Sequence, residues 1–265
     1  MMLNFRRTDP PGGSDRPPVV ILHGLFGSGD NWLGVARAIE SEYTVLLPDL
    51  PNHGGSPHTS SFSYPEMAEA VVGFLSEQGI PRCILTGHSM GGKTAMAVAL
   101  KYPQRVERLC VVDIAPKSDP ARHTQILAAM QEVAEAAVHS RREAEAIMAR
   151  RLESARERAF LQKSLGEDED GVYRWKLNLD LIRRDYETAI AWPYHANDGV
   201  QPYEGDVMFI AGGKSGYLKQ SDLSQIRQLF PNASMREIAD AGHWVHADRP
   251  DEFISVYRSF LSGNI

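Results

Sequence analysis

The sequence has little cysteine. Its 265 residues include two, Cys83 and Cys110, and both lie in apolar runs that predict buried strands. Two separated cysteines provide neither a disulfide framework nor a zinc-binding spacing. We therefore expect both to be small buried hydrophobic residues, and we expect no metal site built on thiolates.

Long apolar segments and an excess of basic charge are also missing. No apolar run approaches the ~18 residues that a membrane-spanning helix needs. The first 15 residues, MMLNFRRTDPPGGSD, lack the apolar core of a signal peptide. The net charge of −6 favours neither a nucleic-acid surface nor an anionic membrane as a partner. We therefore predict a cytoplasmic protein that inserts into no membrane.

The composition is that of a globular chain with a large core, with 43% hydrophobic and 23% charged residues. Apolar runs without alternation predict strands buried on both faces, and helical patterns lie between them. This rhythm of strand and helix predicts an α/β fold whose mostly parallel central sheet has helices on both faces. The predicted strands are 19–22, 43–47, 83–85, 109–113, 207–211 and 235–238.

Residues 117–205 interrupt the rhythm. They are rich in Ala, Glu and Arg and contain no convincing strand. An insertion between two strands of a parallel sheet lies at the carboxyl edge, where such sheets bind ligands. We therefore predict a core of residues 1–116 and 206–265, and a helical cap of residues 117–205 that covers the site. Its predicted helices lie around 123–139, 140–151, 153–164, 173–179 and 186–191.

Residues 87–94 read GHSMGGKT and fit two catalytic motifs. The first five residues fit G-x-S-x-G, a sharp strand-to-helix turn that presents a nucleophilic serine, here Ser89. All eight also fit the phosphate-binding loop G-x-x-x-x-G-K-[ST], and a later apolar strand ends in Asp113, as in magnesium-binding NTPases. The stretch alone supports either acyl transfer or phosphoryl transfer.

Other segments favour acyl transfer. His243 follows the last predicted strand, where a catalytic base is needed, and His246 is a weaker candidate. The glycine-rich loop after the first buried strand can aim the Leu25 N–H, with that of Met90, at an oxyanion. The phosphate-loop hypothesis leaves both the glycine loop and His243 without a role.

Four segments resemble the α/β-hydrolase superfamily in their order and spacing: HGLFGSGDNW, PDLPNHGGSP, GHSMGGKTAM and AGHWVHADRP. The first segment, VVDIAP and the WKLNL stretch at 175–179 more narrowly resemble the small bacterial YbfF-like esterases and related ABHD-type hydrolases. This resemblance implies a serine esterase with a catalytic triad, a nucleophile elbow and a cap, and with no metal or cofactor. The Ser nucleophile argues against the dehalogenase and epoxide hydrolase branches.

The triad's acid is not where most such hydrolases carry it. Residues 212–217 contain no Asp or Glu, and Ser215 stands near the expected position. Asp113 ends the neighbouring strand, about 4.8 Å from the strand that carries Ser89, and the group that the chain resembles also uses this position. We predict Asp113 as the acid and Ser215 as an auxiliary hydrogen-bond donor. Less favourably placed carboxylates are Asp206, Asp222 and Asp240.

The sequence thus predicts a serine hydrolase that cleaves small-molecule carboxylic esters, or acyl thioesters such as acyl-CoA, through an acyl-enzyme on Ser89. Four aromatic side chains are candidates for contact with the substrate, although core packing explains them equally well: Phe26, Trp244, Trp175 and Tyr186. A C–C bond hydrolase of the same fold, a P-loop ATPase and a non-catalytic binding module stay open as alternatives. No oligomeric state is favoured.

Overall fold

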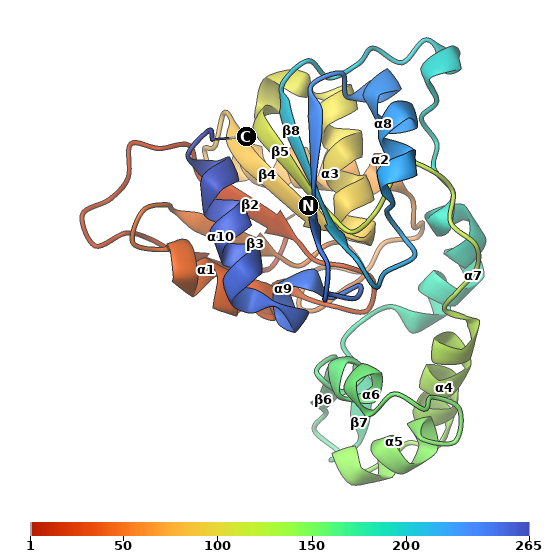
Figure 1. Cartoon of the computed structure of the whole chain (residues 1–265). Helices are drawn as coiled ribbons and strands as arrows, with labels where there is room; N and C mark the ends of the chain where they lie inside the picture. Colours follow the sequence, from red (N-terminus) through yellow and green to blue (C-terminus); the bar gives the residue numbers. More distant parts are fainter. Residues whose placement is uncertain (1, 265) are drawn as a thin grey trace.

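The computed structural model describes residues 2–264, and a seven-stranded sheet runs through its centre (Figure 1). The strand order is β1-β3-β2-β4-β5-β8-β9. Strand β1 is antiparallel to β3, and all other neighbours are parallel, which confirms the predicted fold class. The strands are β1 Phe5–Thr8, β2 Val19–Leu22, β3 Val45–Pro48, β4 Cys83–His88, β5 Val106–Val112, β8 Asp206–Gly212 and β9 Ala233–Ile238.

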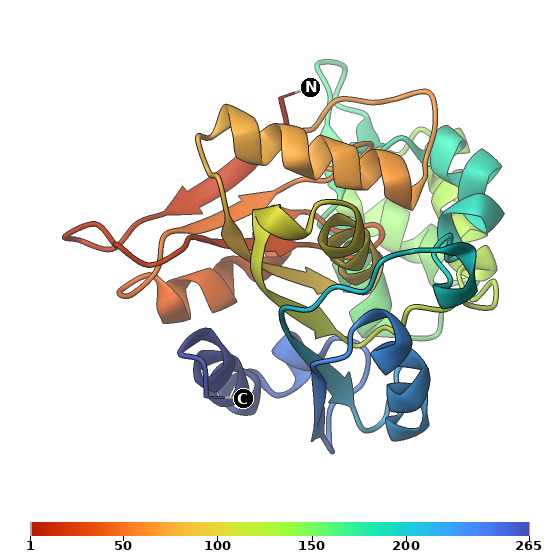
Figure 2. The same cartoon turned by 90° about the horizontal axis from the view of Figure 1, so that it is seen from above.

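Helices cover both faces of the sheet, as Figure 2 shows from above. Successive residues of a strand point to opposite faces, so the aliphatic run of β2 enters two cores. The larger core contains α2 (Tyr64–Glu77), α3 (Met90–Lys101) and α8 (Leu223–Leu229), and the smaller one α1 (Leu33–Ile39), α9 (Val245–Asp248) and α10 (Pro250–Leu261). Val20 and Leu22 pack in the larger core with α2 and α3, while Val19 and Ile21 pack with α1 and α10.

Both cysteines lie in these cores, as predicted. Cys83 and Cys110 are free thiols without solvent exposure. Burial raises the pKa of the Cys83 thiol to about 12, so its sulfur stays protonated and unreactive at neutral pH. In the part of the chain that the structure describes, no helix is both long enough and apolar enough to cross a bilayer.

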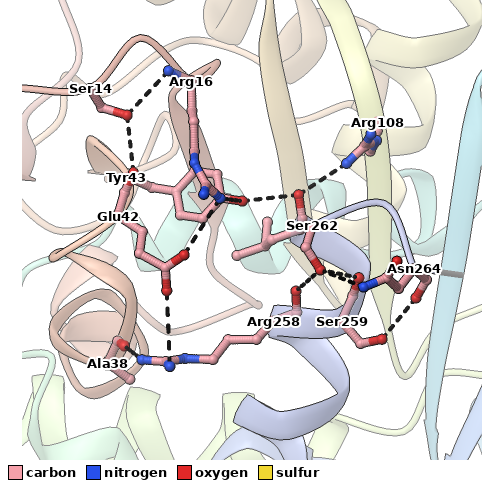
Figure 3. Close-up of polar contacts among 11 residues, drawn as sticks. Ser14, Arg16, Ala38, Glu42, Tyr43, Arg108, Arg258, Ser259, Ser262 and Asn264 are labelled. Carbon is pink, nitrogen blue, oxygen red and sulfur yellow. Dashed lines mark hydrogen bonds and ion pairs between the residues drawn. The ribbon is translucent and has the colours of Figure 1, made fainter.

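The carboxyl end of α10 is fastened to the rest of the fold by side chains (Figure 3). Tyr43 and Arg108 each donate a hydrogen bond, at 3.0 Å, to the Leu261 carbonyl at the end of the helix. Arg258 donates to the Ala38 carbonyl in α1. The last carbonyls of a helix have no partner within the helix, so Tyr43 and Arg108 satisfy the Leu261 carbonyl. Together with the Arg258 contact they hold α10, which follows the His243 loop, in place.

Helices make up about half of the segment 117–205, which lies beside the sheet (Figure 1). Its helices are α4 Thr124–Glu135, α5 Arg141–Met148, α6 Ala155–Gln162 and α7 Leu179–Ile190. The helix predicted over 173–179 and the expectation of no strand in this segment are both wrong, because β6 (Leu165–Glu167) and β7 (Tyr173–Trp175) form a hairpin. The Asp168 carboxylate accepts from the Asp170 and Val172 N–H groups and so folds the turn that the pattern did not reveal.

The turn between β4 and α3 allows the strand to pass directly into the helix at Ser89. Its backbone has φ 54° and ψ −119°, a region that residues other than glycine rarely occupy. A Cβ on Gly87 would stand 2.7 Å from the Gly92 nitrogen, and one on Gly91 would stand 2.5 Å from the His23 carbonyl oxygen. The glycines on either side of Ser89 are therefore required by the close crossing of backbones.

We predict that Gly87→Ala lowers the free energy of unfolding by more than about 2 kcal/mol, because the new methyl group must push backbone atoms apart. The matched control is Gly73→Ala in α2, where an added Cβ meets no atom within 4 Å. This change should stabilise the fold by about 0.5–1 kcal/mol, since alanine favours helix. Urea unfolding of both variants measures the difference, and equal stability would contradict the prediction.

Candidate active site

Ser89 stands at the carboxyl edge of the sheet, where β4 ends and α3 begins. Its N–H donates to the Val112 carbonyl at 3.1 Å, and its own carbonyl accepts from Lys93 N at 3.0 Å. These bonds hold the turn between the neighbouring strand β5 and the first turn of α3. The residue is 8% exposed and lines a cavity of about 420 Å³, so its hydroxyl is accessible to a small molecule.

Asp113 follows β5 directly and is completely buried. Its backbone has a positive φ of 51°, and its N–H donates to the Ile210 carbonyl of β8 at 2.8 Å. Three donors surround the carboxylate. Gly212 N–H lies 2.9 Å from Oδ1, His243 Nδ1 lies 2.7 Å from Oδ2, and the Ser215 hydroxyl also donates to Oδ2. The carboxylate thus links β5 to the loops after β8 and β9.

The other candidate acids lie elsewhere. Asp240 is exposed and forms an ion pair with Lys214 at 3.0 Å, which lowers the pKa of its carboxyl. Asp222 accepts from Lys117 at 2.7 Å. Asp206 faces Arg108 at 3.6 Å, at the opposite end of β8. The structure therefore brings Asp113, and none of these three, to the imidazole of His243.

His243 lies in the loop after β9 and also lines the large cavity. A carboxylate can only accept hydrogen bonds, so the contact with Asp113 places the imidazole proton on Nδ1 and leaves Nε2 as the basic nitrogen. The ring stacks on Tyr217, with centroids 4.1 Å apart. Gly212 lets the loop that carries His243 come close to the end of β8, because a Cβ on Gly212 would stand 2.8 Å from the Ala241 carbonyl oxygen.

His88 precedes Ser89 and braces the His243 loop. Its Nε2 donates to the His243 carbonyl at 2.8 Å. Burial holds the pKa of His88 well below the usual 6.5, with a further contribution from His243. A neutral ring with its proton on Nε2 satisfies this contact. The residue therefore has a positioning role that its place in the motif did not reveal.

His23 shapes the glycine loop that carries Leu25. Its Nε2 accepts from the Leu50 N–H at 2.9 Å, so Nδ1 holds the proton and donates to the Gly24 carbonyl at 2.9 Å. Gly24 itself must lack a side chain, because a Cβ would stand 2.9 Å from His88 Nδ1. The loop therefore packs against the nucleophile turn.

Leu25 and Met90 are near each other at this packing contact, and both line a second cavity of about 30 Å³ beside Ser89. The Met90 N–H lies in the first turn of α3, where no carbonyl of the helix can accept it. Leu25 comes two residues after His23, which directly follows β2. These positions suit the oxyanion donors that the sequence predicts.

The predicted substrate-contacting residues fall in different places. Phe26 and Trp244 line the large cavity, and Tyr186 lines the small one. Trp175 lines neither; its indole N–H donates to the Met130 carbonyl at 2.8 Å, within the insertion. The sequence missed Tyr217 and His123, which line both cavities. Tyr217 lies two residues after Ser215 in the sequence, and this closeness could have indicated that it belongs to the site, whereas nothing in the sequence marks His123.

Lys93 does not serve a phosphate loop. Its side chain is 1% exposed, and its Nζ lies 2.6 Å from Asp119 Oδ2 and 3.0 Å from the Ile190 carbonyl oxygen. The motif residues from Met90 onward are helical, so no loop of successive N–H groups is present to surround a phosphate. The P-loop alternative is therefore wrong. Across residues 2–264, no group of three or more His, Cys, Asp or Glu is placed to hold a metal ion.

Comparison with known proteins gives consistent results. A family described as alpha/beta hydrolase fold matches residues 17–250. Mouse sn-1-specific diacylglycerol lipase ABHD11 is 40% identical over 259 residues, which span 95% of this chain and 83% of that protein. Escherichia coli (strain K12) esterase YbfF is 34% identical over 99% of this chain and 100% of its own. A solved structure described as a marine microorganism esterase has a TM-score of 0.92 at 35% identity, covering 98% and 99% of the two chains.

We predict that Asp113→Asn lowers kcat by roughly 10⁴-fold, because an amide can hold the imidazole in the wrong tautomer. The matched control is Asp240→Asn, which changes an exposed residue of the same type and should leave kcat within about twofold. Turnover of p-nitrophenyl butanoate measures both. Normal kcat in Asp113→Asn with a large loss in Asp240→Asn would assign the acid to Asp240.

The buried histidines predict a pH dependence of stability. Burial lowers the pKa of His53 to about 3 and also lowers that of His23. Between pH 6.5 and about 3 the unfolded state therefore binds protons that the folded state does not, so stability falls as pH falls. Each such imidazole costs up to ~1.4 kcal/mol per pH unit.

His53→Phe, which keeps a ring but binds no proton, should flatten the dependence by about 1.4 kcal/mol per pH unit near pH 5.5. Urea unfolding between pH 7.5 and 5 measures this slope. His58→Phe is the control, because that side chain is exposed and reaches water in both states. An unchanged slope in His53→Phe would contradict the prediction.

Proposed function

The chain belongs to the alpha/beta hydrolase fold family, and we propose that it is a carboxylesterase-type serine hydrolase that cleaves small-molecule esters through an acyl-enzyme on Ser89. One observation carries the proposal. The buried Asp113 carboxylate accepts from His243 Nδ1 at 2.7 Å, and His243 shares a cavity with Ser89. Serine, base and orienting acid follow the chain order Ser…Asp…His in which α/β-hydrolases carry them. The esterase and lipase names of the similar proteins support the same reaction class.

In the proposed mechanism, His243 Nε2 takes the proton from the Ser89 hydroxyl while the serine oxygen attacks the ester carbonyl. Asp113 keeps the imidazole oriented and stabilises the imidazolium. The same proton then passes to the leaving alkoxide, which departs as the alcohol. A water molecule, deprotonated in turn by His243, attacks the acyl-enzyme; the bond to Ser89 breaks, His243 returns the proton to the serine oxygen, and the acid is released.

The N–H groups of Leu25 and Met90 stabilise the oxyanion of each tetrahedral intermediate. Loss of one such donor typically raises the barrier by about 2.7–4 kcal/mol. His23 supports this role, because its ring links the Gly24 carbonyl of the glycine loop to the Leu50 N–H in the segment after β3. Ser215 is a positioning residue that shares Asp113 Oδ2 with the imidazole.

The insertion of residues 117–205 acts as a cap. Its residues Arg122, His123, Ile126 and Phe160 line the large cavity together with Ser89 and His243. The Ser164 hydroxyl donates to the Phe26 carbonyl at 2.5 Å and joins the insertion to the glycine loop. Such a cover reduces the contact of the site with bulk water, which strengthens the electrostatic interactions there.

Thioesters react through the same steps, and the C–C bond hydrolases of this fold use the same triad. Esters remain the preferred substrates because the similar proteins are named as esterases or lipases. A panel of p-nitrophenyl esters, acyl-CoAs and vinylogous diketones separates the three classes by kcat/KM.

We predict that Ser89→Ala lowers kcat for p-nitrophenyl butanoate at least ~10⁴-fold and abolishes covalent labelling by a fluorophosphonate, because no other residue of the site supplies the nucleophile. Ser60→Ala, at an exposed loop position, is the matched control and should label normally. Mass spectrometry of the labelled peptide identifies the site. Normal turnover in Ser89→Ala would exclude the acyl-enzyme.

A further inference from the structure

The two cavities beside Ser89 differ greatly in size, and we infer from them that the enzyme takes esters with a short, uncharged acyl group and a large apolar alcohol. The acyl group occupies the small cavity, and the alcohol occupies the large one. This inference rests on the proposed serine hydrolase mechanism, and it goes further by assigning the two halves of the substrate.

His243 determines which half goes where. It must protonate the leaving oxygen, so the alcohol lies on its side of the scissile bond, within hydrogen-bond reach. His243 lines the cavity of about 420 Å³, together with Ser89, and does not line the smaller one. The cavity of about 30 Å³ is instead lined by Ser89, Leu25 and Met90, the nucleophile and the two proposed oxyanion donors. The acyl group, which stays on Ser89 after the alcohol leaves, therefore extends into the small cavity.

The small cavity limits the length of the acyl chain. A water-sized group needs about 10–15 Å³ of such volume, so about 30 Å³ holds two or three carbon atoms beyond the carbonyl. The walls include Phe62, Tyr64, Ile114 and Tyr186, which are between 2% and 5% exposed. Such close-packed side chains do not yield easily to a longer chain. Acetyl to butanoyl groups fit this space.

The far wall of the small cavity offers no charge to an acyl group. Lys93 Nζ and Asp119 Oδ2 lie 2.6 Å apart and neutralise each other. The remaining donors of Lys93 are directed to the Ile190 carbonyl, at 3.0 Å, and toward the ring of Tyr64, whose centroid is 5.6 Å away. A second carboxylate on the acyl group would be buried there without a partner, which is unfavourable.

The large cavity suits an alcohol with a large apolar part, although the charged Arg122, Arg156, Glu157 and Lys163 also line it. Its walls include Phe26 from the glycine loop, Ile126 and Phe160 from the insertion, and Trp244 after the catalytic histidine. Phe160 and Trp244 pack with ring centroids 5.1 Å apart. The volume of about 420 Å³ is in the range of pockets that bind drug-sized molecules.

Two isomeric esters test the assignment. Octyl acetate and methyl nonanoate have the same atoms and similar polarity, but the first joins a two-carbon acyl group to an eight-carbon alcohol and the second a nine-carbon acyl group to a one-carbon alcohol. We expect kcat/KM, measured by proton release at constant pH, to be at least tenfold higher for octyl acetate. A ratio near one, or a preference for methyl nonanoate, would overturn the inference and leave the serine hydrolase proposal intact. Turnover of neither ester, together with no fluorophosphonate labelling of Ser89, would instead refute the proposed function.

Two Phe→Ala variants identify the cavities. Phe62→Ala widens the small cavity, so it should reduce the octyl acetate to methyl nonanoate ratio at least threefold. Phe160→Ala widens the large cavity, so it should change kcat/KM for octyl acetate. Its selectivity among p-nitrophenyl esters of different acyl length should stay within twofold of that of the unaltered enzyme. Acyl-chain selectivity that responds to Phe160→Ala would place the acyl group in the large cavity. Should Phe62→Ala fail to fold, the isomeric pair on the unaltered enzyme still decides the question.

Discussion

A carboxylate without solvent must be surrounded by hydrogen-bond donors, and Asp113 satisfies this constraint by joining three segments. Its partners come from the end of β8, the loop that follows β8 and the loop that follows β9. An unpaired charge at this depth is strongly unfavourable, so the segments cannot separate without a large cost. The hydrogen bonds that stabilise the buried carboxylate also set the tautomer and orientation of His243. Stability and catalytic geometry therefore depend on one group.

The neighbouring histidines extend this arrangement without adding charge. His23 and His88 are buried with lowered pKa values, and each uses a ring nitrogen to hold a carbonyl group in place. His23 holds the glycine loop, and His88 holds the loop of His243. Because both rings stay neutral, they position backbone without placing a positive charge beside His243. Of the imidazoles of His23, His88 and His243, that of His243 contacts Asp113, and the other two contact backbone carbonyls.

The sequence predicts those features that depend on local constraints. Apolar runs locate the strands, because a strand buried on both faces accepts few polar residues. The glycines around Ser89 locate the turn, because the close crossing of backbones there accepts few other residues. Asp113 is predictable because parallel neighbours end at the same edge. The β6–β7 hairpin is not predictable from helical composition, because a single carboxylate, Asp168, folds its turn. The contacts of His123 and Tyr217 also depend on how the insertion packs on the core, which no local pattern encodes.

The letters that imitate a phosphate loop have a structural explanation. Lys93 lies one helical turn after Ser89, and its ammonium group meets Asp119 near the start of the insertion and the Ile190 carbonyl at the end of α7. Both connections of the insertion thus converge on α3, the helix that follows Ser89. Removal of one partner of a buried ion pair typically costs about 3–5 kcal/mol, so the insertion is firmly placed relative to Ser89. A lysine in this position fixes the wall of the small cavity, and through it the length of acyl chain that the site accepts.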